Sequence, residues 1–513
     1  MQLLAAAARC APKKQLATLV TPSDTFSLSE ATRVHRGELI RSVPTSRFLR
    51  GRVLESSDGT AEDYARSEEV ETIGTFVSHS WNCDASLKYN ALLYHFYSTP
   101  WLCGCMLLLL VSEVLAVHFD WTLWTWYQIN GSNEVVHVGT FGTSWCALLL
   151  LPGATFYLMP YLVPSWVVRR WPHMNCFLDK CSIAQADSPL KKASIAQLGA
   201  YIKRSERFLL VLDHGYMQRL WCVYELAVFS KINPPLDKLQ IVSVNSVRHA
   251  LVLLSWQSFS NVLCVPGMCT VFGTPAVNAW LAASVPDALA RSALLLLLYT
   301  TFMVPCFMVP CYFFLYPDAE RLEKERRALE EQLKTFRVET LHCSVEEDRV
   351  FVEGRIRSFF GSFEAFEGLV KNVLKERLMP HFVPDVLPRG LLNVGVVLPQ
   401  FLFWSDFYIM STFSPSGATA YSANTLTMAI GFTFLYLELG MRFSSLIFKR
   451  MRASTAIADA WKRIFSVLLC SVVFAFLCGL GCVLSAPSVP QEIFQIYGVA
   501  LGVAVALLRW TWP

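Results

Sequence analysis

Apolar positions along this chain follow two patterns: short runs separated by amphipathic stretches, and long runs of spanning length. Four short β-rich runs predict strands, at Thr72–Ser78, Asn175–Leu178, Phe208–Leu212 and Leu239–Val244. Three stretches with apolar residues at helical spacing predict helices, at Ala85–Ser98, Leu190–Arg204 and Leu220–Lys231. Strands that alternate with helices predict an α/β fold with a parallel sheet and helices on both faces.

The long apolar runs predict transmembrane helices, each of which needs about 20 apolar residues. We expect about eight, at Trp101–Phe119, Thr143–Val168, Leu263–Val285, Ser292–Tyr316, Leu391–Thr412, Thr425–Gly440, Ile464–Ser485 and Ile493–Leu508. Composition agrees, because 54% of the 513 residues are hydrophobic and 16% are charged, against about 25% charged in an average globular protein. An even number of spans keeps nearly all Lys and Arg on the cytosolic side. The sequence therefore predicts a multi-pass integral membrane protein with both termini cytosolic and with membrane lipid as a partner.

The first predicted membrane hairpin interrupts the α/β domain. We expect a disordered cytosolic N-terminal tail at 1–70, the first part of the α/β domain at 71–100, a transmembrane hairpin at 101–168, the second part of the domain at 169–258, a second hairpin at 259–316, a cytosolic helical segment at 317–390 and four transmembrane helices at 391–513.

Metal and nucleic-acid binding are not expected. Ten of the sixteen cysteines lie in predicted spans, where cysteine behaves as a small apolar residue. His173, Cys176 and Cys181 are an alternative zinc grouping, but the fourth ligand is missing and the spacing is unusual.

Candidate chemistry gathers where the predicted parallel strands end. Ligands of such sheets bind at the carboxyl ends of the strands. Ser78–Asp84, Asp179–Asp187 and Asp213–Arg219 leave those ends. We therefore expect them to converge, with Glu225 in the helix beside them.

Three motifs occur in this order: FVSHSWNCD, FLDKCSIAQAD and SIAQLGAYIKRSERFLLVLDHGYMQRLWCVYEL. Together they resemble the Toll/interleukin-receptor (TIR) domains, and the middle motif is also similar to the related heterokaryon-incompatibility (HET) domains. The resemblance covers Glu71–Tyr97 and Asn175–Val244, about a fifth of the chain. It implies a TIR-like cytosolic domain in a signalling protein, with partners that include other copies of the domain.

Enzymatic members of that family cleave NAD at the nicotinamide–ribose bond. The resemblance implies that Glu225 is the catalytic carboxylate, that NAD is a substrate and that no cofactor is required. A carboxylate suits this reaction because loss of nicotinamide leaves an oxocarbenium-like charge on the ribose. By position, the resemblance assigns the nucleotide-side loop to Ser78, Ser80, Trp81 and Asp84, and Tyr216 and Trp221 offer aromatic surface for a base.

Departures from the family keep other functions open. Ser80 and Trp81 stand where many members have arginine or glycine, the loop Lys180–Ser188 has one lysine and one aspartate, and no fifth strand is evident after Val244. The first alternative is an interaction module of the same fold without chemistry, in which Glu225 is a solvated helix residue. The second is a channel or transporter regulated by the TIR-like domain, with the lone acids Glu113, Asp406 and Glu438 in its spans.

Overall fold

A computed structural model defines two compact units in this chain. It describes residues 40–382, except 52, 57, 130–133, 143–154, 256–269, 271–272 and 306–308, together with short pieces between 446 and 472. The first unit draws on Met1–Ser98, Tyr157–Arg248 and Leu322–Val383, and the second on Thr99–Phe156, His249–Arg321 and Pro384–Pro513.

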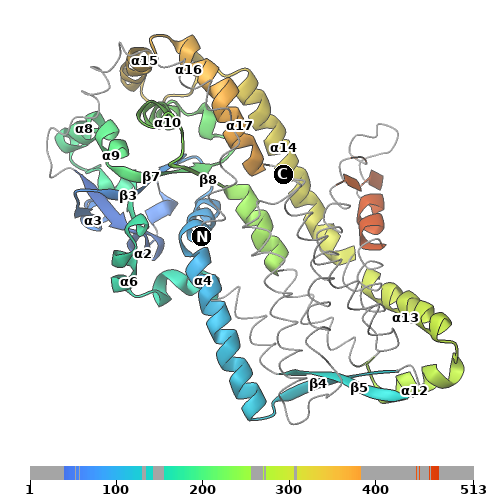
Figure 1. The fold of residues 1–513 in the computed structure, drawn as a ribbon. Coiled ribbons are helices and arrows are strands. Elements are labelled where there is room, and N and C mark those ends of the chain that lie inside the picture. Colours follow the sequence, from blue (N-terminus) through green and yellow to red (C-terminus); the bar gives the residue numbers. More distant parts are fainter. Residues whose placement is uncertain are drawn as a thin grey trace. The chain divides into compact units, whose positions relative to one another are not determined.

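A six-stranded sheet with the order β2-β1-β6-β3-β7-β8 forms the centre of the first unit (Figure 1). Its parallel strands are β6 (Asn175–Phe177), β3 (Ile73–His79), β7 (Ser205–Leu212) and β8 (Leu239–Ser243). In chain order this arrangement is 2-1-3-4, a doubly wound topology whose switch point lies between β3 and β7. The four strands coincide with the four apolar runs, so a mixed α/β sheet is present, assembled from segments on both sides of a long insertion.

The N-terminal segment predicted as a disordered tail to residue 70 is structured from Ile40 onward. It contains β1 (Arg41–Pro44), α2 (Thr45–Leu49), η4 (Val53–Glu55), α3 (Ala61–Ala65) and β2 (Glu68–Glu69). β1 pairs antiparallel with β6 and with β2, which gives the sheet its mixed character. The prediction failed because tertiary contacts hold this segment: Nζ of the buried Lys180 donates to the carbonyls of Val53, at 3.0 Å, and Ser56, at 3.1 Å.

Aromatic side chains fix the register of the central strands. Phe76 of β3 lies opposite Phe177 of β6 and Phe208 of β7. The rings stack with centroids 4.6 Å and 5.3 Å from the Phe76 ring. Tyr201 and Phe229 cover this ladder from the helices above, at 4.6 Å from Phe177 and 4.5 Å from Phe208. Since side chains alternate along a strand, even-numbered residues of β3 and β7 face these helices and odd-numbered ones face away.

Helices cover both faces of the sheet (Figure 1). α9 (Leu198–Lys203) and α10 (Leu220–Ile232) lie on the aromatic face, and the first part of α4 (Ala85–His118) lies on the other. The predicted helix Leu190–Arg204 is two helices, α8 (Ser188–Ala196) and α9, which meet at Gln197. The shorter elements between the strands are α6 (Ser165–Arg170), η5 (Pro172–Met174), α7 (Asp179–Ser182) and η6 (Tyr216–Gln218).

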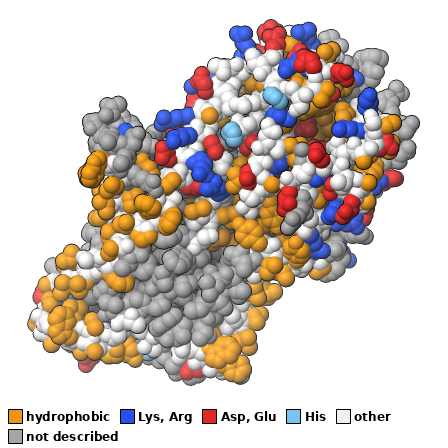
Figure 2. Space-filling view, turned by 180° about the vertical axis from the view of Figure 1, so that it is seen from behind, with side chains coloured by type: hydrophobic (Ala, Val, Ile, Leu, Met, Phe, Trp, Pro, Cys, Tyr) orange, Lys and Arg blue, Asp and Glu red, His pale blue; other side chains and the backbone are white. Residues whose placement is uncertain are grey.

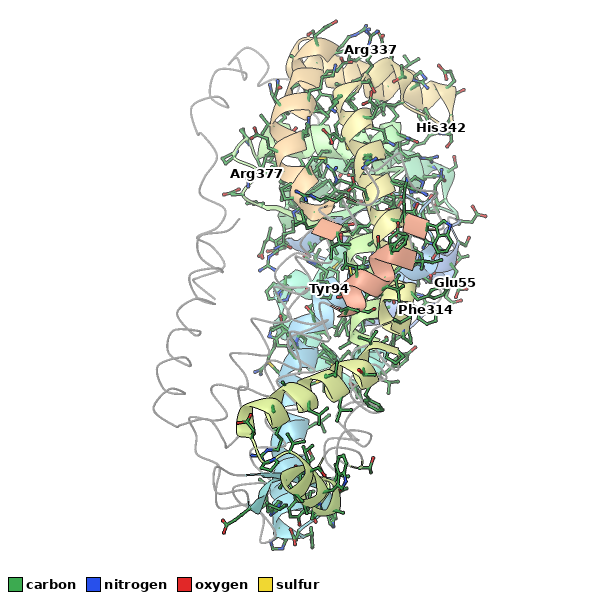
Figure 3. The ribbon with its side chains drawn as sticks, turned by 90° about the vertical axis from the view of Figure 1, so that its right-hand side faces the viewer. Glu55, Tyr94, Phe314, Arg337, His342 and Arg377 are labelled. Atoms are coloured by element: carbon green, nitrogen blue, oxygen red, sulfur yellow. The ribbon has the colours of Figure 1, made fainter. Side chains whose placement is uncertain are left out.

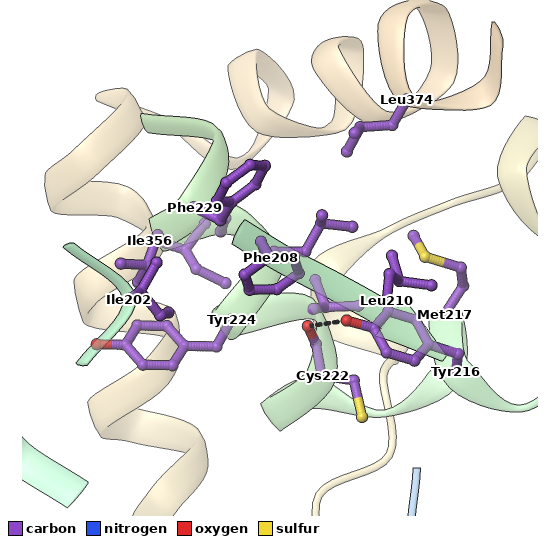
Figure 4. Packing of buried hydrophobic residues seen from close by; sticks show 14 of the residues in the cluster. Ile202, Phe208, Leu210, Tyr216, Met217, Cys222, Tyr224, Phe229, Ile356 and Leu374 are labelled. Carbon is purple, nitrogen blue, oxygen red and sulfur yellow. Dashed lines mark hydrogen bonds between the residues drawn. The ribbon is translucent and has the colours of Figure 1, made fainter. Parts of the chain in front are cut away.

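A helical module, residues 322–382, packs on the outer side of α10. It begins with the second half of α14 (Val309–Lys334) and continues with η8 (Val338–Thr340), α15 (Glu346–Phe360), α16 (Phe363–Leu369), η9 (Val370–Leu374), α17 (Lys375–Leu378) and η10 (Met379–Phe382). Ile356 and Leu374 share one apolar cluster with residues of the sheet and α10 (Figure 4). His342, labelled with Arg337 in Figure 3, exchanges backbone hydrogen bonds of 2.8 Å and 3.0 Å with Gln218 and Leu220. The module is thus attached directly to the start of α10.

The second unit contains the rest of α4 and a β-hairpin. The hairpin strands are β4 (Thr122–Ile129) and β5 (Val135–Gly142), followed in the chain by α12 (Pro275–Ser284), α13 (Ala288–Met303) and the first part of α14. Asn278 Nδ2 donates to the carbonyl of Tyr127 at 3.0 Å and so connects α12 to β4. Apolar side chains gather on the surface of this unit (Figure 2), and Leu107, Val114, Trp280, Leu297 and Phe314 are each more than half exposed.

The described helices contradict the predicted membrane topology. Within the part of the chain that the structure describes, no helix combines the length and apolarity that crossing a membrane requires. The predictions of about eight transmembrane helices and of a multi-pass membrane location are therefore wrong. Apolar runs misled because helix bounds do not follow them: the first predicted span is part of α4, which begins in the sheet unit, and the fourth is divided between α13 and α14, whose second half is highly charged.

Several of the sequence predictions fall on residues that are not described. The predicted spans Leu391–Thr412, Thr425–Gly440 and Ile493–Leu508 lie wholly outside the described residues, and Thr143–Val168, Leu263–Val285 and Ile464–Ser485 lie partly outside them. Asp406 and Glu438 are also outside.

Candidate functional site

The carboxyl edge of the sheet brings together the segments expected to converge. Ser78 is the last residue but one of β3, Asp179 begins α7 just after β6, and Asp213 follows β7. Glu225 lies on α10, the helix that follows β7. These positions flank the switch point between β3 and β7, where the chain leaves the two strands toward opposite sides. Ligands of doubly wound sheets bind at such a point.

Glu225 is held against the end of β3 by Ser78. Ser78 is fully buried, and as an even-numbered residue it faces α10 on the same side as Phe76. Its hydroxyl forms a short hydrogen bond with Glu225 Oε2. The Glu225 side chain itself is half-buried. The pairing places one carboxyl group at the switch point in a fixed orientation.

The contact continues from Ser78 into a chain of hydroxyl groups. Ser78 Oγ lies 2.6 Å from the Tyr216 hydroxyl, which donates to the carbonyl of Cys222 at 3.2 Å (Figure 4). Each hydroxyl group has one hydrogen to donate. If Tyr216 donates to the Cys222 carbonyl, Ser78 must donate to Tyr216, and the protonated Glu225 carboxyl must donate to Ser78. When Glu225 is ionised, Ser78 donates to the carboxylate instead, and only two hydrogens remain for the three contacts. All three contacts are hydrogen bonds only when Glu225 is protonated.

Burial acts on Glu225 in the same direction. Loss of solvation raises the pKa of Glu225 from 4.5 to about 8, against the opposing effect of the Ser78 hydrogen bond. The Asp179 carboxylate adds to the rise, because a second negative charge nearby disfavours ionisation. Burial also raises the pKa of Tyr216, so this hydroxyl keeps its hydrogen. The free site therefore holds a neutral carboxylic acid near pH 7.

The loop after β3 divides the other predicted nucleotide-side residues. Ser80 is buried and accepts the backbone amide of Asn82 at 3.3 Å, so it shapes the turn. Trp81 Nε1 donates to Asp179 Oδ2 at 2.7 Å, which connects the ends of β3 and β6. Asp84 caps α4 by accepting the amides of Ser86 and Leu87, and the Ser86 hydrogen bonds lower the pKa of its carboxyl. Only Trp81 of these three contacts another residue at the sheet edge.

The two predicted aromatic surfaces have different surroundings. Tyr216 has no exposed surface, and its hydroxyl is part of the Glu225 chain. Trp221 lies away from that chain: its Nε1 donates to Asp348 Oδ2 of α15 at 3.1 Å, and its ring lies 6.5 Å from that of Phe351. In this structure Trp221 attaches the helical module to α10.

Sequence reasoning missed three groups at this edge. It placed Asp179 in a segment at this edge without a role of its own, whereas Asp179 binds Trp81 and acts on the charge of Glu225. It assigned no role to Lys88, although a lysine one turn into the helix after β3 was a visible signal. Cys222 supplies the carbonyl that ends the hydroxyl chain, and its Sγ lies 3.4 Å from the carbonyl oxygen of His79. No side-chain pattern reveals a role played by a backbone carbonyl.

The described residues offer no metal site. No group of three His, Cys, Asp or Glu side chains among them is placed to hold an ion. Cys176 of the alternative zinc grouping is fully buried, and its Sγ contacts the His173 carbonyl at 3.9 Å rather than the ring.

The resemblance to TIR domains rests on the motifs and remains a prediction about the family. Comparison of the chain with models of known protein families, with curated proteins and with solved structures finds no match.

Proposed function

We propose that the first unit cleaves NAD at the nicotinamide–ribose bond and that Glu225 is the catalytic carboxylate. The observation that carries the proposal is the placement of Glu225 at the switch point, where its carboxyl contacts Ser78 and burial raises its pKa. A buried carboxyl with a strongly raised pKa, beside a ligand-binding edge of a sheet, is typical of catalytic sites.

A neutral Glu225 suits a cationic substrate. The nicotinamide ring of NAD carries a positive charge, and such a charge beside the carboxyl favours its ionised form. Binding therefore releases the Glu225 proton to solvent, and Ser78 turns its hydrogen toward the carboxylate. The negative charge then appears only when the substrate is in place.

The reaction balances with this one residue. The bond between ribose C1′ and the nicotinamide nitrogen breaks, and its electron pair leaves with nicotinamide. The Glu225 carboxylate stabilises the oxocarbenium-like ribose. Water adds to C1′ and gives its proton to Glu225, which restores the neutral resting acid. The products are ADP-ribose and nicotinamide, and the net proton is the one released on binding.

Release of nicotinamide by the purified full-length chain tests the proposal. We expect NAD-dependent release by the wild type and a loss of at least 100-fold in Glu225→Gln. Glu206→Gln, at an exposed glutamate of β7, is the matched control and should retain activity. Turnover that survives Glu225→Gln unchanged would overturn the catalytic assignment.

Proton release provides an independent readout. Calorimetry at pH 7 with a non-cleavable NAD analogue that keeps the cationic ring, in two buffers of different ionisation enthalpy, counts the protons released on binding. We expect nearly one proton per analogue bound for the wild type and none for Glu225→Gln. Equal proton counts for the two proteins would contradict the mechanism even if cleavage is observed.

The second candidate is an interaction module of the same fold without chemistry, which self-associates. The specific observation in its favour is that β8 is the last strand of the parallel run among the described residues, and that the helical module covers the outer side of α10. Sedimentation should then show concentration-dependent self-association of a wild type that releases no nicotinamide.

A further inference from the structure

A second polar cluster lies at the same sheet edge, on the face opposite Glu225. It consists of His79 at the end of β3, Asp213 after β7 and Lys88 in α4. Their exposed fractions are 7%, 3% and 1%. His79 is odd-numbered and therefore faces α4, whereas the neighbouring Ser78 faces α10; Asp213 directly follows β7, the strand paired with β3.

Each member of this cluster has one polar atom without a hydrogen-bond partner among the described residues. These atoms are Lys88 Nζ, Asp213 Oδ1 and His79 Nε2. An unsatisfied buried polar group costs about 1–3 kcal/mol, and a charged one costs more. Three such atoms at one strand edge indicate a position that something else occupies.

The donor and acceptor types of the three atoms define the occupant. Burial lowers the pKa of His79 to about 4, so its ring is neutral near pH 7. One ring N–H donates to the Val77 carbonyl, which leaves Nε2 as an acceptor. Burial raises the pKa of Asp213, whose carboxyl accepts the Gly215 amide and leaves Oδ1 without a hydrogen-bond partner among the described residues. Lys88 Nζ is a donor only. The occupant must therefore accept one hydrogen bond and donate two.

The three groups are close enough to influence one another. The field of Lys88 acts on the protonation of both His79 and Asp213. Burial lowers the pKa of Lys88, and the nearby Cys83, Asp179 and Asp213 oppose this effect. The centroid of the Trp81 ring lies 4.4 Å from Lys88 Nζ, and the hydrogen bond from Trp81 Nε1 to Asp179 holds the indole.

We propose that Lys88, His79 and Asp213 bind a primary carboxamide, the group that nicotinamide carries. Its carbonyl oxygen accepts from Lys88, and its two N–H groups donate to His79 Nε2 and Asp213 Oδ1. The proposal rests on the proposed NAD cleavage only in naming the substrate part that occupies the position. The ribose then lies toward Glu225 and the ring crosses the edge of the sheet, as ligands at a switch point do.

Binding of free nicotinamide and of nicotinic acid to the full-length chain tests the assignment. A carboxylate cannot donate to His79 or Asp213 and is repelled by Asp213, so the wild type should prefer nicotinamide by at least 10-fold. In Asp213→Asn the side-chain amide can donate, so the preference should fall at least fivefold. Lys88→Met should weaken nicotinamide binding at least 10-fold, whereas Lys192→Met, an exposed lysine of α8, should not.

The outcomes separate the two proposals. The preference for nicotinamide over nicotinic acid is measured on the wild type alone. The proposal is therefore tested even if Lys88→Met misfolds. Equal affinities for the two compounds, or no nicotinamide binding at millimolar concentration, would overturn the carboxamide site. Selective nicotinamide binding by a protein that does not cleave NAD would support this site and count against the proposed reaction.

Discussion

Glu225→Gln should make the stability of the first unit less sensitive to alkaline pH. The folded-state pKa of Glu225 is raised from 4.5 to about 8. Between these values the folded chain keeps a proton that the unfolded chain has lost, so the free energy of unfolding of the wild type falls as pH rises. This contribution of Glu225 to the free energy of unfolding is fully present below pH 4.5 and is lost by the time pH passes about 8. Glutamine cannot ionise, yet it can donate to Ser78 as the protonated acid does.

The size of the effect follows from the shift. At about 1.4 kcal/mol per pKa unit, the shift corresponds to roughly 5 kcal/mol. The side chain is only half-buried, and solvent screening reduces this figure, so we expect a difference of about 2–4 kcal/mol. Glu225→Gln should match the wild type at pH 4.5 and exceed its free energy of unfolding by that amount at pH 9.

Urea unfolding of the full-length chain, followed by hydrogen exchange of the peptide 205–232, reads the sheet unit separately from the second unit. Comparing the two proteins at the same pH cancels the intrinsic pH dependence of exchange. Glu206→Gln, at an exposed site, should stay within about 0.5 kcal/mol of the wild type throughout. If Glu225→Gln and the wild type lose stability in parallel from pH 4.5 to 9, Glu225 is ionised in the free protein and the hydrogen count along the hydroxyl chain is wrong.

Other substitutions probe the same site and its support. Ser78→Ala removes the hydrogen bond that favours the ionised Glu225, so the loss of stability at alkaline pH should move to higher pH. Tyr216→Phe frees the Ser78 hydrogen for the Glu225 carboxylate, so the same loss should move to lower pH. Shifts in the same direction for the two variants would refute the hydrogen count along the chain of hydroxyl groups. Gly74→Ala places a Cβ 1.7 Å from the backbone oxygen of Pro172. The clash should lower the urea midpoint by an amount equivalent to about 3 kcal/mol or more. An unchanged urea midpoint would mean that β3 and η5 are not packed as described. Phe208→Ala removes the ring that stacks between Phe76 and Phe229 and should cost about 3–5 kcal/mol in the same assay. A cost below about 1 kcal/mol would place that ring outside the core.

Local pattern was sufficient for the parallel strands because each is a buried apolar run bounded by polar residues. It also predicted that Ser78 and Glu225 would converge, since parallel strands all end at one edge. Trp221 shows the limit of such reasoning. It lies one helical turn before Glu225, a spacing that puts both residues on one side of α10, but the helical module packs there and Asp348 of α15 accepts the hydrogen bond of the indole.

Elements held by long-range contacts were not visible in the sequence. β1 pairs with β6 across more than 100 residues, and the surrounding segment is fixed by Lys180, whose partners are backbone carbonyls. The helical module was predicted as helical but not as a partner of α10. Long apolar runs led to elements that were predicted and not found, the transmembrane helices. Hydropathy counts apolar residues without showing where helices begin or which elements cover them.

The end of β3 explains how one strand serves two clusters. Ser78 and His79 are consecutive, so the alternation of a strand turns the first toward Glu225 on α10 and the second toward Lys88 on α4. A slip of one residue in the pairing of β3 with β7 would exchange these faces, placing a hydroxyl beside Lys88 and an imidazole beside Glu225. The stacked Phe177, Phe76 and Phe208 oppose such a slip, because it would turn the Phe76 ring out of the ladder. The packing of the aromatic core, two residues before the site, therefore determines which chemical group each face of the sheet presents.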